Sequence, residues 1–452
     1  MKPTGLVFFP AFDWAISPTH PEREERLLYT RDQIFEEGIM DLPQIKEYQP
    51  QMATNRDIAR THFCVPTVGD QATDAHRISC GGALTIADAL MRGEIRNGFA
   101  LVRPPGHHAM RVAHGYRGFC NINNEAIMID YLRHHYQVKR IAIVDTDVHH
   151  GDGTQEIFWH DPDILFISFH QDGRTLYPGT GFTDEIGGPL AQGYTLNIPL
   201  PPGTGDKGIL HVLDSLVLPI LKEFKPDLIV NSAGQDNHYT DPLANMRFSA
   251  RGYAELNQRL APDIAVLEGG YSVETALPYI NMGIIMAMAG IDYGYLHEPD
   301  YDPELTRESR MGMDSIKGTV ETLQKTWQNR RRLIESARNT KEKFYQRHKQ
   351  IYYDTDGIHE QQVETLRLCH DCPGYLAIDS HARFHGGYAN RVYCVSIPHQ
   401  ACPDCIQSAI ELYEALKKRY DRHDSIHLQD KVNDRFLRYD CVKGQENSLE
   451  KD

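Results

Sequence analysis

Short apolar runs alternate with amphipathic segments along the first two thirds of the chain. The runs expected to form buried strands are residues 98–102, 141–145, 164–168, 228–232 and 264–267. Between them, apolar residues in segments such as 82–92 and 209–223 recur with helical spacing. Strands that alternate with helices predict a parallel sheet with helices on both faces, a three-layer α/β fold.

The pattern changes after about residue 292. Residues 298–308 are acidic and contain proline, which indicates a linker. Apolar residues then recur at steps of three, four or seven from Ile316 to Ile351, which predicts one long helix. Between Ile316 and Gln350 it carries ten Lys or Arg against three Glu. We expect its apolar stripe to pack on the preceding domain and its basic face to be solvated; the alternative is a nucleic-acid or dimer contact.

Two Cys-x-x-Cys pairs follow in the last segment. Their spacing is that of a four-cysteine structural zinc site, whereas a redox pair would need a βαβ context that is absent here. The expected ligands are Cys369, Cys372, Cys402 and Cys405, with Cys394, His381 and His399 as spare candidates. A helix over residues 407–420 is typical of a zinc ribbon or treble clef. Because the segment is small and polar, we expect metal binding to supply most of its folding energy.

Composition narrows the class of protein. The chain has 452 residues, 41% of them hydrophobic, and no apolar run approaches the ~18 residues of a membrane span. A secretory signal pattern is not seen at the N-terminus, and nine cysteines in that context favour reduced thiols or metal over disulfides. The net charge of −15 argues against wholesale nucleic-acid binding but leaves local basic patches open. We expect a cytoplasmic protein without a membrane or nucleic-acid partner.

The richest chemistry follows the apolar run 141–144, where residues 145–154 read DTDVHHGDGT. Asp147 and His149 lie two apart, so on an extended backbone both side chains point the same way. A carboxylate and an imidazole on one face make half of a divalent-metal site. The alternative is a polar loop whose acids cap the next helix.

Three further segments carry similar chemistry. Residues 103–108 read RPPGHH, which places His107 and His108 on a loop fixed by proline and glycine. Asp236 and Asp241 follow the apolar run that ends at residue 234, and Glu268, Gly269, Gly270 and Tyr271 follow the run 264–267. Ligands bind at the carboxyl ends of strands in α/β sheets, so these groups are expected to converge.

With these motifs in this order, residues 1–295 resemble the histone deacetylase superfamily, the zinc-dependent group that includes lysine deacetylases and acetylpolyamine amidohydrolases. The sequences of residues 232–234 (SAG) and 267–271 (LEGGY) resemble those of the class II and bacterial branches of the family more than those of class I. The resemblance implies an arginase/deacetylase-like fold, with a long helix and a small zinc module appended. We divide the chain into a catalytic domain (1–295), a linker with the basic helix (296–360), and the four-cysteine module with a C-terminal tail (361–452).

The resemblance also implies residue roles. It assigns the catalytic zinc to Asp147, His149 and Asp241. His107 and His108 are then the general base and acid, oriented by Asp145 and Asp152 respectively. Tyr271 donates to the developing oxyanion; the alternative is an ordinary tyrosine in a glycine-rich turn.

A second set of residues is implied around the substrate and beneath the metal. The expected substrate contacts are Gly118, Phe119, Tyr177, Phe248 and Asp70, with Phe248 at the tunnel mouth and Asp70 on the rim. A tyrosine at 177 replaces the usual phenylalanine, and Phe248 stands where polyamine-selective members carry a glutamate. An inner K⁺ site is expected at Asp145, Asp147, His149, Ser168 and Phe169. Arg23 is expected to line an internal channel.

We therefore predict a zinc-dependent amide hydrolase that removes acetyl or related acyl groups from lysine side chains of proteins or peptides. The apolar Phe248 disfavours the alternative substrate, an acetylated small amine. A non-catalytic subunit that binds acyl-lysine is less favoured, because every expected catalytic position is filled. The C-terminal helix and zinc module are candidate surfaces for a homo-oligomer or a protein partner.

Overall fold

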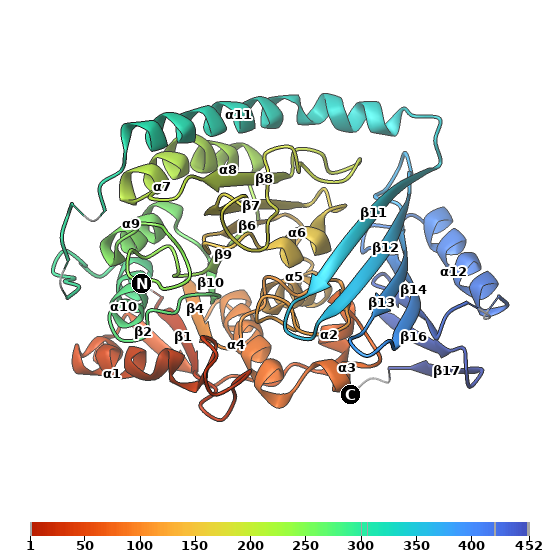
Figure 1. The fold of residues 1–452 in the computed structure, drawn as a ribbon, viewed down its shortest axis with the longest axis horizontal. Helices are drawn as coiled ribbons and strands as arrows, with labels where there is room; N and C mark the ends of the chain where they lie inside the picture. Colours follow the sequence, from red (N-terminus) through yellow and green to blue (C-terminus); the bar gives the residue numbers. More distant parts are fainter. Residues whose placement is uncertain (1, 300, 305, 420–421, 450–452) are drawn as a thin grey trace.

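The computed structural model describes residues 2–299, 301–304, 306–419 and 422–449. Two sheets lie side by side, an eight-stranded parallel sheet in the N-terminal part and a seven-stranded sheet in the C-terminal part (Figure 1). We call the first part, with α11, the first domain, and residues 344–449 the appended sheet. No helix in the described part of the chain is both long and apolar enough to cross a membrane.

Every neighbouring pair of strands in the first sheet is parallel. In spatial order the strands are β2 (Ile45–Tyr48), β1 (Thr4–Phe9), β4 (Asn97–Val102), β10 (Ile264–Leu267), β9 (Leu228–Ala233), β6 (Ile141–Asp145), β7 (Ile164–Gln171) and β8 (Thr195–Leu200). Side chains alternate between the faces: Ile141 and Ile143 enter one core, and Ala142 and Val144 enter the other.

Helices cover both faces, as the sequence predicts. One core includes residues of α1 (Leu28–Glu36), α7 (Asp206–Val212), α8 (Leu218–Phe224), α9 (Ala250–Leu260), α10 (Leu277–Ala289) and α11 (Arg310–Arg338). The other includes residues of α2 (Asn55–Thr61), α4 (Asp74–Met91), α5 (Asn124–Tyr136) and α6 (Asp152–Phe158). Short connecting elements are α3 (Val68–Gln71), β3 (Phe63–Cys64) and β5 (Val112–Ala113).

Helix α11 packs on the first domain through its apolar stripe, as expected. Ile316, Val320 and Leu323 are buried in the core beside α7 and α8, and the indole Nε1–H of Trp327 donates to Glu223 at 2.7 Å. The predicted extension to Ile351 is wrong, since the helix ends at Arg338 and residues 344–353 form strand β11. Residues seven apart face opposite sides of a strand, and accordingly Phe344 is exposed while Ile351 is buried.

The appended sheet is larger than the zinc ribbon or treble clef that we predicted. Its strands, in order, are β11 (Phe344–Tyr353), β12 (Ile358–Arg367), β13 (Leu376–Arg383), β14 (Ala389–Ile397), β15 (Ser425–Asp430), β16 (Arg435–Asp440) and β17 (Gln445–Ser448). The predicted boundary between residues 360 and 361 therefore falls inside β12. The expected helix after the second cysteine pair is α12 (Pro403–Lys417), and its predicted end at Tyr420 lies outside the described residues.

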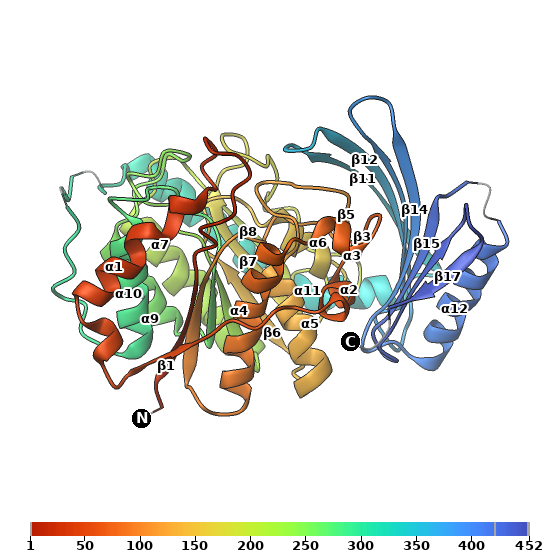
Figure 2. The same cartoon turned by 90° about the horizontal axis from the view of Figure 1, so that it is seen from below.

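The appended sheet has a core of its own. Helix α12 connects β14 to the parallel strand β15 and lies on the face away from the first domain (Figure 2). Val395, Ile397, Ala409, Tyr413 and Ile426 are fully buried between the helix and the sheet. The premise that this segment has little core is therefore wrong, and burial of these side chains contributes to its folding energy beside any metal.

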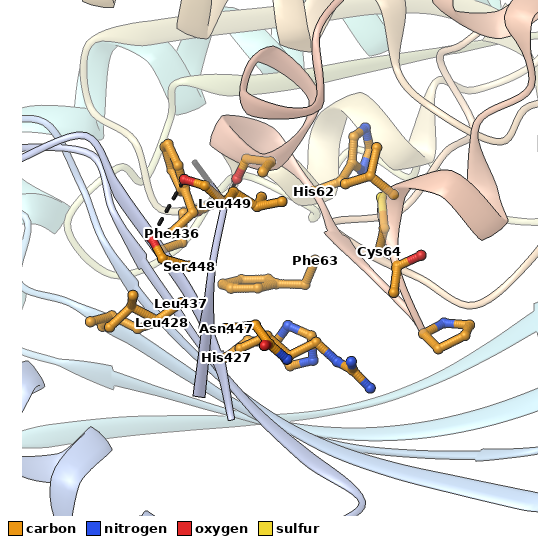
Figure 3. Close-up of a pocket in the computed structure, with 16 residues that line it drawn as sticks. His62, Phe63, Cys64, His427, Leu428, Phe436, Leu437, Asn447, Ser448 and Leu449 are labelled. Carbon is orange, nitrogen blue, oxygen red and sulfur yellow. Dashed lines mark hydrogen bonds between the residues drawn. The ribbon is translucent and has the colours of Figure 1, made fainter. Parts of the chain in front are cut away.

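Charged pairs join the appended sheet to the first domain. Lys431 Nζ lies 2.7 Å from Asp130 Oδ2, and Arg60 Nε lies 2.9 Å from Asp434 Oδ1. An apolar cavity of about 190 Å³ lies between the two parts (Figure 3). Two of the rings that line it, Phe63 from β3 and His427 from β15, contact each other edge to face, with 6.1 Å between centroids.

Candidate active site

The loop after β4 holds the two adjacent histidines against the sheet. The backbone N–H groups of Gly106 and His107 donate to one carboxylate oxygen of Glu268 at 2.7 and 3.0 Å. A Cβ on Gly106 would lie 2.5 Å from the backbone nitrogen of Asn124, so this close approach requires glycine. Glu268 directly follows β10, so the loop is fixed to the neighbouring strand end.

The segment after β6 supplies the predicted carboxylate and imidazole. His149 Nδ1 lies 3.1 Å from Asp147 Oδ1 and 3.0 Å from Asp236 Oδ2. The ligand atoms of Asp147, His149 and Asp236 all lie within 4.8 Å of one another, which suits a metal ion. Asp236 is thus part of the cluster, although the sequence pointed to Asp241 as the third ligand.

Asp241 lies close to Asp236 and His149 of this cluster. Its carboxylate accepts the N–H of Leu243 at 2.9 Å and of Tyr271 at 2.7 Å, and both of these residues line the cavity. Asp236 is completely buried, and its Oδ1 accepts the N–H of Val148 at 2.8 Å. Two carboxylates therefore lie near His149: Asp236 contacts its imidazole directly, and Asp241 accepts from the backbone of two residues that line the cavity.

The donor set fits a divalent cation. Burial, and then the charge of Asp236, raise the pKa of the Asp241 carboxyl to about 7. Burial and the charge of Asp147 likewise raise the pKa of Asp236. Carboxylates that share a dry site repel one another, and a bound cation would offset both the repulsion and the desolvation. Carboxylate oxygens with one imidazole nitrogen are ligands that zinc accepts.

Each histidine of the pair has a carboxylate at Nδ1, as predicted. His107 Nδ1 lies 3.3 Å from Asp145 Oδ2, and His108 Nδ1 lies 2.8 Å from Asp152 Oδ1. The two rings are 4.1 Å apart between centroids, and both line the cavity. With Nδ1 engaged, Nε2 of His108 is left for a reacting group, whereas Nε2 of His107 lies 3.8 Å from Asp147 Oδ1.

The surroundings give the two imidazoles different proton affinities. Burial lowers the pKa of His107, but the carboxylates of Asp147 and Asp145 raise it well above its ordinary value. Burial lowers the pKa of His108 well below its ordinary value, and the neighbouring His107 and His149 lower it further. Paired groups whose pKa values are pushed apart are typical of acid–base sites.

A hydrogen-bond chain runs outward from His108. The guanidinium of Arg117 donates to Asp152 and to the hydroxyl of Tyr177. The Tyr177 hydroxyl in turn donates to Asp354 Oδ1 at 3.2 Å. No role was predicted for Arg117, which lies nine positions after His108 and reaches its partner Asp152 only through folding.

Tyr271 follows the glycine pair after β10 and is almost completely buried. The guanidinium of Arg26 lies 5.0 Å from the centroid of its ring. Arg26 is fully buried and donates to the carbonyl oxygen of Gly270 at 2.7 Å and to Glu22 at 2.8 Å. Arg23, which was expected to line an internal channel, is instead a surface residue that pairs with Glu25.

A cavity of about 260 Å³ opens above these groups. It is lined by Phe119, Tyr177 and Gly118, three of the expected substrate contacts, and the two aromatic rings form walls of it. A Cβ on Gly118 would lie 2.4 Å from the His108 ring, and the residue has a φ of +52°, so the wall requires glycine here. Leu243, Leu176 and Pro105 add apolar surface that the sequence did not single out.

Two predicted substrate contacts, Phe248 and Asp70, are not among the residues that line this cavity. Phe248 is buried in the hydrophobic core against Tyr253, with 4.5 Å between ring centroids, and lies away from the tunnel mouth. Asp70 is exposed on α3, where it accepts a hydrogen bond from the hydroxyl of Thr67 at 2.5 Å. The acid that lines the cavity is instead Asp354, from the turn between β11 and β12.

The residues expected around an inner K⁺ lie together beneath the site. Ser168 pairs with Asp145 in the register of β6 and β7, and Phe169 follows it in the core. The Ser168 hydroxyl lies 2.9 Å from His170 Nδ1. Occupancy by K⁺ stays a prediction.

The four cysteines converge as their spacing predicts. Their Sγ atoms lie within 4.8 Å of one another, and Cys369 Sγ is 3.9 Å from Cys402 Sγ. Tetrahedral coordination with Zn–S bonds of ~2.3 Å places sulfur atoms ~3.8 Å apart, so the geometry suits zinc. The cluster ties the β12–β13 connection to the start of α12. Burial raises the pKa of Cys372, while backbone N–H groups lower that of Cys369 to about 7, against the effect of burial.

Comparisons with known proteins agree with this geometry. A family model described as the histone deacetylase domain matches residues 65–284. A protein of Archaeoglobus fulgidus named "Probable deacetylase" is 44% identical over 352 residues, which cover 71% of this chain and 97% of that protein. Histone deacetylase 14, chloroplastic, of Arabidopsis thaliana is 43% identical over 212 residues, 44% of this chain and 49% of that protein.

Solved structures of histone deacetylases share the fold of this chain. The structure titled "Crystal Structure of HDA15 HD domain" superposes with a TM-score of 0.62 at 27% identity, covering 75% of this chain and 99% of that one. The fold and the site thus define a hydrolase with a histone deacetylase domain. This chain belongs to the histone deacetylase family. The appended sheet lies beyond the residues that the family model matches.

Proposed function

We propose that this protein is a zinc-dependent amide hydrolase that removes acetyl or related acyl groups from lysine side chains of proteins or peptides. The observation that carries the proposal is the cavity between Phe119 and Tyr177. It has aromatic walls suited to the methylenes of a lysine side chain. Its floor holds the two carboxylate-oriented histidines, the Asp-His cluster and Tyr271.

We assign the catalytic zinc to Asp147, His149 and Asp241. Asp241 is preferred over Asp236 because its carboxylate is held by two cavity-lining residues, whereas Asp236 lies beneath His149. When bound, zinc polarises an acyl carbonyl and lowers the pKa of a water to about 7. We further propose that Cys369, Cys372, Cys402 and Cys405 hold a structural zinc, and that Asp145 and Ser168 contribute to a K⁺ site.

The protein's own side chains then move protons. Nε2 of the His107–His108 pair accepts a proton as water adds to the acyl carbon. The Tyr271 phenol donates a hydrogen bond to the oxygen that becomes negatively charged. The imidazole returns its proton to the leaving nitrogen as the C–N bond breaks, which yields a carboxylate and a free amine. Asp145 and Asp152 hold the rings in the required orientation throughout.

A second candidate substrate is an acetylated small amine. Phe248 would disfavour it only as an apolar gate at the tunnel mouth, and Phe248 is buried in the core instead. The carboxylate of Asp354 at the cavity also favours this candidate, because it could pair with a second ammonium.

A substrate panel tests the proposal. Purified protein is assayed against an acetyl-lysine peptide, a peptide with a longer acyl chain, and acetylspermidine, with amine release as the readout. We expect the acetyl-lysine peptide to be hydrolysed with the highest kcat/KM, and Asp147→Asn to abolish turnover. Absence of hydrolysis from all three substrates, or an unchanged rate for Asp147→Asn, would contradict the proposal.

A further inference from the structure

The appended sheet reaches the active site through the turn between β11 and β12. Asp354 in this turn is half-buried and lines the catalytic cavity. Its Oδ1 accepts the N–H of Gly118 at 2.9 Å and the hydroxyl of Tyr177 at 3.2 Å. Both partners are walls of the cavity, so a residue outside the family-matched range completes its lining.

The turn is fixed in place by contacts on both sides. Asp356 Oδ2 accepts the N–H of Tyr116 at 2.7 Å, and a Cβ on Gly115 would lie 2.3 Å from the same oxygen. The buried hydroxyl of Tyr353 lies 2.7 Å from the carbonyl oxygen of Val112 and 2.8 Å from Glu360 Oε2. Asp354 is therefore held on the segment that leads from the catalytic histidines to Phe119.

The carboxylate of Asp354 is available to a ligand. Both of its hydrogen bonds within the described residues fall on Oδ1, which leaves Oδ2 for a further donor. The nearby guanidinium of Arg117 is bonded to Asp152 and Tyr177, and no ion pair of Asp354 is formed among the described residues. A negative charge without an ion-pair partner thus stands at a cavity whose other walls are largely apolar.

We propose that Asp354 is a specificity-determining residue that binds a cationic group of the substrate, an ammonium or guanidinium beyond the acylated amine. The proposal rests on the amide hydrolase function above and refines its substrate class. A charge-assisted hydrogen bond at a partly desolvated position favours such substrates over neutral ones of the same shape. The cation can come from a basic residue beside the acyl-lysine of a peptide or from the second amine of an acylated diamine.

The variant Asp354→Asn isolates the charge. Its amide oxygen can still accept from Gly118 and Tyr177, so the wall is preserved while the negative charge is lost. The matched control is Asp356→Asn, which removes one charge from the same turn and keeps an acceptor for the Tyr116 N–H.

Two matched substrate pairs give the readout. The first pair is two acetyl-lysine peptides, one cationic with flanking arginines and one neutral with flanking glutamines. The second pair is a mono-acetylated diamine, which is cationic, and the acetylated monoamine of equal length, which is neutral. For at least one pair the unmodified protein should prefer the cationic member about three- to tenfold in kcat/KM, as for a partly exposed ion pair. Asp354→Asn should bring that ratio close to one, and Asp356→Asn should keep it.

The ratio separates specificity from structure, because a distorted wall would slow both members of a pair alike. Which pair responds identifies the source of the cation. An equal rate for cationic and neutral members, a ratio that survives in Asp354→Asn, or an equal loss in Asp356→Asn would overturn the inference and leave the hydrolase function standing. Absence of hydrolysis from every substrate would overturn both.

Discussion

Gly269 offers a severe test of the metal site, because its lack of a side chain lets the backbone pass against two carboxylates. A Cβ at this position would lie 2.2 Å from Asp236 Oδ2 and 2.5 Å from Asp147 Oδ2, where ordinary contact begins at 3.4 Å. For Gly269→Ala, the Asp236 oxygen must therefore retreat by about 1.2 Å (3.4 − 2.2). It cannot do so freely, because the N–H of Val148 and the imidazole of His149 hold that carboxylate.

A misplacement of ~1 Å in a catalytic constellation costs on the order of 10²-fold in rate. We expect Gly269→Ala to lose at least that factor in kcat/KM for an acetyl-lysine peptide and to bind zinc more weakly. Zinc content and amine release would be measured on the same sample. The control is Gly318→Ala in α11, because a Cβ at Gly318 meets no atom within 4 Å. This substitution should stabilise the helix by ~1 kcal/mol and leave turnover unchanged. Wild-type turnover and zinc content in Gly269→Ala would refute the reasoning.

Three further predictions concern Tyr271, Phe248 and Asp434. Tyr271→Phe should lower kcat ~10²–10³-fold with little change in KM in steady-state kinetics, and a change in KM alone would make Tyr271 a wall of the pocket. Phe248→Ala should lower the free energy of unfolding, measured in urea, by ~3–5 kcal/mol and leave the ratio of peptide to polyamine turnover unchanged. A changed ratio without loss of stability would instead show that Phe248 lies at the tunnel mouth. Burial alone would raise the pKa of Asp434, but hydrogen bonds from Arg56 and Arg60 lower it to about 2. The depressed pKa means that this contact stabilises the protein above the ordinary aspartate pKa of ~3.9 and is lost as the pH falls toward 2. The stability difference between the unmodified protein and Asp434→Asn should therefore shrink between pH 5 and pH 2.5, and a constant difference would count against the contact.

The sequence identified groups whose partners lie at neighbouring strand ends. Asp147 and His149 are two residues apart on one segment, and the carboxyl ends of parallel strands meet at one edge of the sheet. The pairings of His107 with Asp145 and of His108 with Asp152, taken from the family, have the expected geometry. The cysteine cluster was predictable because ligand spacing alone restricts which thiols can converge.

The errors concern features that only packing decides. Arg23 and Arg26 belong to the same short segment, and only the buried contacts with Gly270 and Glu22 single out Arg26. Phe248 follows Asp241 closely in sequence, but the loop between them turns its ring into the core. Asp354 belongs to a segment predicted as helix and linker, and its place in the cavity depends on a sheet whose pairing is long-range.

The central claim is that Asp147, His149 and Asp241 hold a catalytic zinc while the four cysteines hold a separate one. The most direct measurement determines zinc by elemental analysis and amine release from an acetyl-lysine peptide on the same preparations of the unmodified protein and Asp241→Asn. We predict two zinc ions per chain and robust turnover for the unmodified protein, against one zinc ion and negligible turnover for a folded Asp241→Asn. Undiminished zinc content and turnover in Asp241→Asn, or full turnover by protein stripped of zinc, would contradict the account.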